Sequence, residues 1–234
     1  MSKRSSKSQN RVLSSLSADD FGLLQNDLKP VSLSLRTVLE QPNRRIDHVF
    51  FLEAGFASVV AVQAKEIKVE IGLIGREGLT GLPIIFGDHR TPHETYMQAA
   101  GHGQRIDAIR LRTAMEVSPT LRGSFLKFAQ AFMVQTAQTA IANARSKLDQ
   151  RLARWILMAH DRLEISNLPL THEFLSLMLG VRRAGVTEAL HALERQGLIH
   201  ASRGEIMVRN RRGIERRAGE SYGIPEAEFR RLIA

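Results

Sequence analysis

The sequence predicts an α+β protein in which a small antiparallel β domain precedes a long helix and, towards the C-terminus, two short helices followed by a β-hairpin. Three observations lead to this fold class. First, short β-rich runs lie between about residues 45 and 110, and one of them alternates with a period of two. Second, apolar residues recur at spacings of three and four after residue 119. Third, a helix–glycine–helix pattern begins at residue 171. A length of 234 residues with 43% apolar residues fits one large or two ordinary globular domains.

Charge and cysteine content limit the classes of function. The chain has 33 Lys and Arg residues against 24 Asp and Glu, a formal net charge of +9, and no cysteine. The basic excess favours polyanionic partners, nucleic acid first and an anionic membrane surface second. Without cysteine there is no disulfide, thiolate zinc site, cysteine-held iron–sulfur cluster or cysteine nucleophile. Because no nucleophile motif frames its Ser, His and Asp residues, we expect no enzyme. His89 and His93 have a metal-ligand spacing only in a helix, which Pro92 disfavours, so we also expect no metal.

The N-terminal residues are polar and basic and lack the apolar core of a signal peptide. The chain also has no run of about 18 apolar residues that would span a membrane. We therefore expect a soluble, cytoplasmic protein with no membrane contact, beginning with a disordered basic tail over residues 1–15.

Residues 45–110 have the pattern of an antiparallel β domain, a sandwich or a barrel. Apolar runs at 49–52 and 56–62 flank Glu53-Ala54-Gly55, which predicts a strand, a turn and a strand. Between 67 and 73 apolar residues alternate with polar ones or glycine, as in a half-buried strand. Strand candidates continue to residue 109. Glycines that predict turns stand at positions 72, 75, 78, 81 and 87.

A long helix is predicted after Ser118-Pro119, because proline is favoured near a helix start. One apolar stripe consists of Leu121, Phe125, Phe128 and Phe132, and a second consists of Leu126, Ala129, Met133, Ala137, Ala140 and Ala144. So broad an apolar surface must be covered, so we expect the helix to pack on the β domain and on a second copy of the chain. The alternative is a core helix within one chain. A further helix is predicted over residues 148–163.

The segment 170–208 has the pattern of a helix-turn-helix followed by a wing. Thr171 is a good N-cap for a short helix that ends at Gly180, and a tight turn leads into a second helix that ends at Gly197. Two short helices joined by a glycine-containing turn form the helix-turn-helix unit. The two runs around the turn Ser202-Arg203-Gly204 then predict a hairpin, which in this position is a wing.

Residues 171–217 contain nine arginines, five glutamates and no lysine. Arg182 and Arg183 fall at the N-terminal end of the second helix, the end that reads base edges in a major groove. Arginine there can donate two hydrogen bonds to one guanine. For each side chain a phosphate contact or plain solvation is the alternative, and Arg203 at the wing tip fits a phosphate contact. The predicted DNA-binding residues are Thr171, His172, Arg182, Arg183, Thr187, Glu188 and Arg203.

The runs LTHEFLSLMLGVRR (170–183), VTEAL (186–190) and QGLI (196–199) closely resemble the winged helix of the Crp/Fnr transcription regulators. DHVFFLEAG (47–55) and GREGLTGLP (75–83) are similar to segments of that family's cyclic-nucleotide-binding-like β-roll. The resemblance implies an N-terminal sensor, a homodimer whose central helices pair, and sequence-specific binding of double-stranded DNA at an inverted repeat. RNA polymerase is then a candidate partner.

The resemblance also implies a domain organisation. We expect a β-roll sensor domain over residues 16–118, a dimerisation helix over 119–146, a winged helix over 147–218 and a C-terminal tail over 219–234. The dimer contacts are expected from Leu121, Phe125, Phe128 and Phe132. The effector pocket would be formed by Glu77, Gly78, Arg90, Thr91 and His93.

The sequence departs from the family where a cyclic nucleotide would bind. Nucleotide-binding members use a Gly-Glu pair and an Arg followed by Ser or Thr, whereas this chain has Glu77-Gly78 in reverse order. His93 takes the place of the arginine, and the following Glu94 would repel a phosphate. Arg90-Thr91 lies about three residues away, so a loop insertion would restore the pair. We expect no cofactor: neither a cyclic nucleotide nor an iron–sulfur cluster.

Two other classes of function remain as alternatives at this point. In the first, the protein is an adaptor whose winged helix and β domain make protein–protein contacts. In the second, it is an RNA-binding module, which is disfavoured because no aromatic platform for unpaired bases stands near the arginines. Retention of particular duplex DNA sequences separates both from a transcription regulator.

Overall fold

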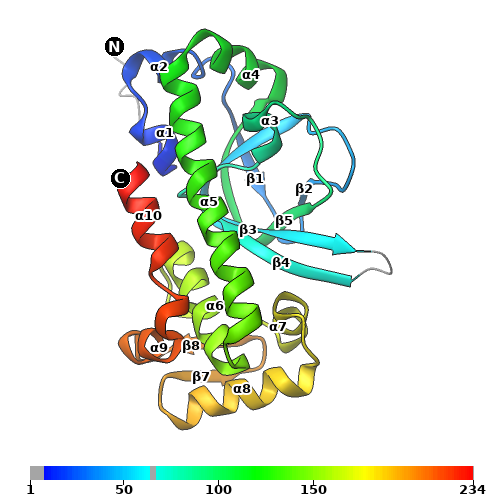
Figure 1. The fold of residues 1–234 in the computed structure, drawn as a ribbon, viewed down its shortest axis with the longest axis vertical. Coiled ribbons are helices and arrows are strands. Elements are labelled where there is room, and N and C mark those ends of the chain that lie inside the picture. Colours follow the sequence, from blue (N-terminus) through cyan, green and yellow to red (C-terminus); the bar gives the residue numbers. More distant parts are fainter. Residues whose placement is uncertain (1–7, 64–66, 234) are drawn as a thin grey trace.

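The computed structural model describes residues 8–63 and 67–233. A twisted antiparallel sheet occupies one side of the molecule, the long helix α5 (Pro119–Arg145) runs past it, and the winged helix lies at the far end of α5 (Figure 1). The expected order of β domain, long helix and helix-turn-helix is therefore present.

The main sheet has the strand order β1-β5-β3-β4, with β2 paired to β5, and all pairings are antiparallel. Its inner face packs on α5 through fully buried aromatic rings, such as Phe51 against Phe125 at a centroid distance of 5.9 Å. The strands are β1 (Lys29–Leu33), β2 (Val38–Glu40), β3 (His48–Gln63), β4 (Ile67–Ile74) and β5 (Glu94–Asp107).

The turn predicted at residues 53–55 is wrong, because β3 continues through it as one strand. The register between β3 and β5 shifts between Leu52 and Ala57, which is the mark of a β-bulge. Gly55 has a φ of 72°, and a Cβ there would lie 2.5 Å from the carbonyl oxygen of Ala99. The glycine thus permits a bulge that bends the strand. Gly72, also predicted in a turn, lies inside β4, where its missing side chain leaves room for the ring of Phe132.

The segment predicted as an N-terminal tail is partly folded. Residues 1–7 lie outside the described part, but Arg11–Ser15 forms helix α1, and Val12 and Leu13 are buried in the core. Asn10 fixes this helix because its amide donates to the carbonyl oxygens of Leu52 at 2.8 Å and Gly78 at 2.7 Å. The other helices of this half are α2 (Ala18–Gly22), α3 (Leu82–Phe86) and α4 (Ala108–Val117).

Helix α5 begins at Pro119, where the Ser118 hydroxyl accepts a hydrogen bond from the Leu121 amide. The side chains predicted for the dimer contact are buried within the same chain, at 0 to 6% exposure. They pack on the sheet and cannot also reach a second copy, so their assignment to the dimer interface is corrected to the protomer core. These residues are Leu121, Phe125, Phe128 and Phe132.

The C-terminal half starts with α6 (Leu148–Leu163), which matches the predicted helix. The segment predicted as a C-terminal tail is not a tail, because α10 (Ile224–Ile233) packs along α5 with Phe229 and Ile233 against the core (Figure 1). The elements between them are β6 (Asn167–Leu168), α7 (His172–Leu179), α8 (Arg183–Arg195), β7 (Ile199–Ser202), β8 (Glu205–Val208), α9 (Arg211–Ala218) and the 3-10 turn η2 (Gly219–Ser221).

A buried polar contact joins the sheet to α6. The indole nitrogen Nε1 of Trp155 donates to Oε1 of Glu70 at 2.6 Å, and the Ser58 hydroxyl donates to Oε2 at 2.7 Å. The Trp155 ring also packs edge-on against Phe56 and Phe174, at centroid distances of 6.2 Å and 5.2 Å. Burial raises the pKa of Glu70 to about 7, although its two hydrogen bonds oppose the shift. Glu70, at a position that the sequence pattern placed on an exposed face, is therefore a core residue.

Candidate nucleic-acid interface

Helix α7 is set by signals within its own sequence. The Thr171 hydroxyl accepts a hydrogen bond from the Phe174 amide at 3.2 Å, and Gly180 ends the helix with a φ of 63°. The apolar side of the helix is buried through Leu175, Met178 and Leu179. The Thr171 cap, the buried apolar side and the glycine that ends the helix together fix the direction in which the chain enters α8.

Helix α8 has one buried side and one open side. Val186, Ala189, Leu190 and Leu193 face the core of the winged helix, and α8 itself lies along the end of the molecule farthest from α4 (Figure 1). The open side of α8 is the only part of the helix that can enter a DNA groove. Its exposed side chains are those of Arg183, Ala184, Glu188, His191 and Arg195.

Five of the predicted DNA-binding residues are exposed, namely Thr171, which caps α7, and four residues on α8 and the wing. Arg182 is the N-cap residue of α8, Arg183 is its first residue, and Glu188 lies about one turn further along. Arg203 is exposed in the two-residue loop between β7 and β8, at the wing tip. None of these four makes an ion pair with any residue in the ranges 8–63 and 67–233.

The other three predicted residues bond within or between the two helices. The Thr187 hydroxyl lies 3.1 Å from Nδ1 of His172 and donates to the Arg183 carbonyl oxygen at 3.1 Å. Thr171 uses its hydroxyl as the cap of α7. These contacts fix the position of α8 relative to α7.

Two exposed residues on α8, His191 and Arg195, are not among the residues predicted to bind DNA. The helical spacing of three and four from Glu188 places both on its side of the helix. That spacing is visible in the sequence and was the signal that could have found them.

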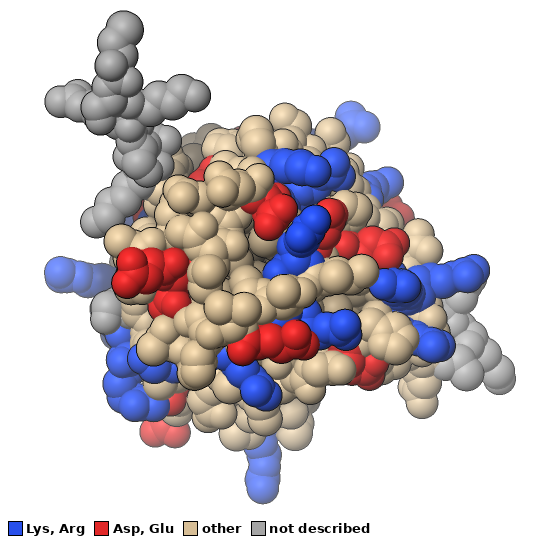
Figure 2. All heavy atoms as spheres, turned by 90° about the horizontal axis from the view of Figure 1, so that it is seen from above, with Lys and Arg blue, Asp and Glu red and all other residues tan. Residues whose placement is uncertain are grey.

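The arginines of residues 171–217 divide into two groups. Arg211 pairs with Asp161 at 2.7 Å and Arg217 pairs with Asp149, so these two fasten α9 to α6. The remaining seven are all exposed: Arg182, Arg183, Arg195, Arg203, Arg209, Arg212 and Arg216. By contrast, acidic and basic side chains are intermixed at the opposite end of the molecule (Figure 2). The winged helix therefore presents a concentrated positive charge.

The residues predicted for an effector pocket do not form one site. Arg90, Thr91 and His93 line a cavity of about 630 Å³ between the sheet and α5. Glu77 lies elsewhere, 2.6 Å from Nη2 of Arg162, and Gly78 is covered by the Phe128 ring. The prediction that groups all five residues in one pocket is wrong. Glu77 and Gly78, which lie in the turn after β4, do not line this cavity.

The cavity beside Arg90 does not suit a cyclic phosphate. Its walls are largely apolar, through residues such as Ile74 and Met133, and its charged lining includes the carboxylates of Glu40 and Asp88 as well as Arg90. Burial lowers the pKa of His93, which disfavours its cationic form. A phosphate would therefore meet Arg90 as its one guanidinium partner, with the Asp88 carboxylate beside it and the Glu40 carboxyl group, whose pKa is raised by burial, in the cavity wall.

Within residues 8–63 and 67–233, no group of three His, Asp or Glu side chains is close enough to hold a metal ion. In the same ranges, no helix combines the length and the apolar character needed to cross a membrane.

Residues 150–217 match the family model of the Crp-like helix-turn-helix domain. This match covers α6 through α9, including the open side of α8 and the wing. The search of curated protein sequences found no match.

Several solved structures share the fold of nearly the whole chain. A protein from Eubacterium rectale assigned to the Crp/Fnr family has a TM-score of 0.69 at 16% identity, covering 87% of this chain and 95% of its own. A c-di-GMP-responsive global regulator from Xanthomonas campestris has a TM-score of 0.68 at 15% identity, with coverages of 82% and 99%. A Crp/Fnr-family transcriptional regulator from Thermus thermophilus has a TM-score of 0.65 at 19% identity, with coverages of 81% and 98%. The predicted fold class is confirmed, and so is the predicted resemblance.

Proposed function

We infer that this chain is a DNA-binding regulator that binds an inverted-repeat operator as a homodimer. The inference starts from its Crp-like helix-turn-helix domain and from the fold that it shares with Crp/Fnr transcription regulators. The observation that carries this function is the open side of α8, with Arg182 and Arg183 at its N-terminal end and Arg203 on the adjacent wing. No observation on the described residues favours the adaptor alternative.

We assign different roles to the exposed and the bonded residues. Arg183 reads a base edge, because it begins the helix whose N-terminal residues face the major groove. Arg203, at the wing tip, contacts a phosphate. Thr171, His172 and Thr187 act as positioning residues, since their side chains already join or cap α7 and α8.

A second copy of the chain is proposed to pack on the exposed stripe of α5. The stripe has alternating spacings of four and three, the pattern of a helix pair, and Leu126 and Met133 on it are 38% and 57% exposed. The alanines at its C-terminal end let two helices approach closely. The exposed stripe consists of Leu126, Gln130, Met133, Ala137, Ala140 and Ala144.

The test compares Arg183→Ala and Arg203→Ala with the unchanged protein on duplexes selected from a random library. Arg183→Ala should lose preference at one base pair of each half-site, by about 1–3 kcal/mol. Arg203→Ala should weaken binding to all sequences by a similar factor. It should also reduce the salt dependence of DNA affinity by the amount expected for about one phosphate contact. Arg231→Ala, far from the winged helix on α10, is the matched control and should change neither.

The proposal fails if Arg183→Ala lowers affinity equally for all sequences and Arg203→Ala has no effect. In that case α8 does not read bases, and the positive charge of the winged helix serves another polyanion.

A further inference from the structure

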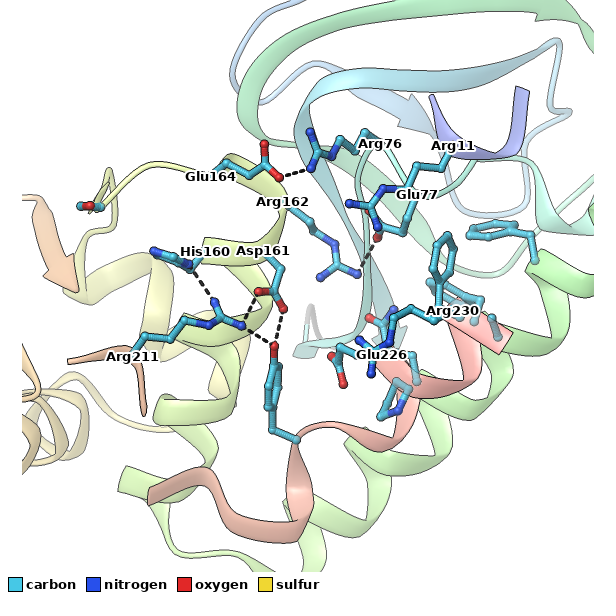
Figure 3. A pocket seen from close by; sticks show the side chains of 18 residues that line it. Arg11, Arg76, Glu77, His160, Asp161, Arg162, Glu164, Arg211, Glu226 and Arg230 are labelled. Atoms are coloured by element: carbon cyan, nitrogen blue, oxygen red, sulfur yellow. Dashed lines mark hydrogen bonds and ion pairs between the residues drawn. The ribbon is translucent and has the colours of Figure 1, made fainter. Parts of the chain in front are cut away.

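A second cavity, of about 680 Å³, lies at the junction of the two halves of the chain (Figure 3). Its walls come from the turn after β4, from α1, α5, the C-terminal end of α6, α9 and α10. None of the predicted DNA-binding residues lines it, and it shares only Phe132 with the cavity beside Arg90. Its volume is in the range of small-molecule sites, about 300–1,000 Å³.

One wall of this junction cavity is apolar. The rings of Phe128 and Phe132 on α5 stand 6.4 Å apart and tilted, with Ala131 on the same helix. Phe229 and Pro225 close the wall from α10. Such a surface takes up an aromatic ring or an acyl chain.

The polar lining of the cavity consists of five arginines and four acidic residues, most of which are paired. Arg162 pairs with Glu77, Arg76 with Glu164, and Arg211 with Asp161. Glu226 accepts a hydrogen bond from the Gly223 amide at the start of α10. These pairs account for the acidic groups Glu77, Asp161 and Glu164.

Two guanidinium groups, those of Arg11 and Arg230, make no ion pair with any residue that the structure describes. In Figure 3 both turn towards the same space as Arg162. The Arg162 side chain is only 9% exposed, and its Nε is buried without a hydrogen-bond partner in the described chain. The spare donors of the cavity are therefore those of Arg11 and Arg230, two exposed side chains at its rim, and they stand beside an apolar wall.

We propose that the junction cavity binds a small organic anion whose carboxylate or phosphate group meets Arg11, Arg230 and Arg162 and whose aromatic or acyl part packs on Phe128 and Phe229. Guanidinium groups in a partly buried site form strong, directed hydrogen bonds with such anions. A purely inorganic anion would leave the apolar wall unused.

The site stays accessible in the proposed dimer. With about 3.6 residues per turn, Ala131 and Gln135 lie on the side of α5 opposite to the exposed stripe. A second copy packed on that stripe would leave the cavity open to a ligand.

A ligand here would touch both halves of the chain. Arg162 belongs to α6 of the helix-turn-helix domain, yet its Nη2 donates to the Leu73 carbonyl oxygen of β4 at 3.1 Å. A ligand that competes for Arg162 would favour one arrangement of the two halves over another. This regulatory consequence rests on the proposed DNA-binding function, whereas the binding itself does not.

The test is a fluorescence titration of the full chain with 8-anilinonaphthalene-1-sulfonate, an aromatic anion. The unchanged protein should bind one molecule per chain, and Arg230→Glu or Arg11→Glu should weaken binding about tenfold or more. Arg231→Glu is the matched control, because Arg231 is the neighbour on α10 but pairs with Glu228 outside the cavity. It should bind as the unchanged protein does.

Two further variants separate a local effect from misfolding and from the other cavity. Ala131→Leu, which fills the apolar wall without changing charge, should also weaken binding, and Arg90→Glu in the β-domain cavity should not. The emission of Trp155, the sole tryptophan, reports whether each variant keeps its fold. Equal affinity of Arg230→Glu and Arg231→Glu, or loss of binding only in Arg90→Glu, would overturn the proposal.

Competition identifies the class of anion. Decanoate displacing the probe indicates an acyl carboxylate, and phenyl phosphate displacing it indicates an aryl phosphate. Equal displacement by phenethylamine would contradict an anion site. If the unchanged protein binds the probe as expected but retains no DNA, the proposed function fails while the site stands. If the bound anion alters DNA affinity in the unchanged protein and not in Arg230→Glu, the coupling holds.

Discussion

The buried carboxyl group of Glu70 should make the stability of the protein depend on pH, and Glu70→Gln should remove this dependence. Burial raises the pKa of Glu70 to about 7 in the folded chain, against an ordinary value of 4.5. A raised pKa stabilises the folded state fully below the ordinary value and progressively less as pH rises through the folded value.

The size of the effect follows from these two values. Between pH 5 and pH 8 the unchanged protein should lose about 2.5 kcal/mol of unfolding free energy relative to Glu70→Gln, at about 1.36 kcal/mol per pKa unit. The glutamine cannot ionise, but its carbonyl oxygen can still accept the Trp155 hydrogen bond. The loss should concentrate between pH 5 and 7 and level off above the folded pKa.

Urea unfolding followed by Trp155 emission measures this difference, because the only tryptophan of the chain contacts Glu70 directly. Glu188→Gln, an exposed carboxylate on α8, serves as the control and should follow the pH profile of the unchanged protein. Parallel profiles for the unchanged protein and Glu70→Gln would refute the reasoning, since the carboxyl would then be ionised to the same extent in the folded and unfolded chain.

Three further predictions address packing. Met133→Glu, on the exposed stripe of α5, should give monomers by light scattering that keep the Trp155 emission of the folded chain. A variant that stays a dimer would show that the interface lies elsewhere. Phe128→Ala, in the protomer core, should cost about 3–5 kcal/mol in urea unfolding, and a cost below about 1 kcal/mol would contradict its burial. Gly78→Ala places a Cβ 2.2 Å from Cε2 of Phe128 and should destabilise by about 1–3 kcal/mol, visible as a lower thermal midpoint.

The helix-turn-helix could be predicted from sequence because its signals are local. Thr171, Gly180 and the apolar spacing of α8 each act within a few residues, and the structure uses them as expected. The exposed arginines follow from the same helical period. His191 follows the same period, but it lies beyond the N-terminal end of the helix, where base contacts are expected.

The long-range contacts could not be predicted in this way. The spacing of Phe125 and Phe128 identifies an apolar stripe on α5, but not whether the sheet or a second chain covers it. The burial of Glu70 depends on Trp155, which is 85 residues away in sequence. Likewise, α10 has so many charged residues that it resembles a tail until α5 provides a surface for Phe229.

In the proposed function, two copies of this chain read one DNA site through their α8 helices. Selection of duplexes from a random library by the full chain, followed by sequencing, tests it most directly. We predict an inverted repeat whose half-sites lie about one helical turn apart, roughly 34 Å between centres. Enrichment of a single half-site, or of no sequence at all, would contradict the claim.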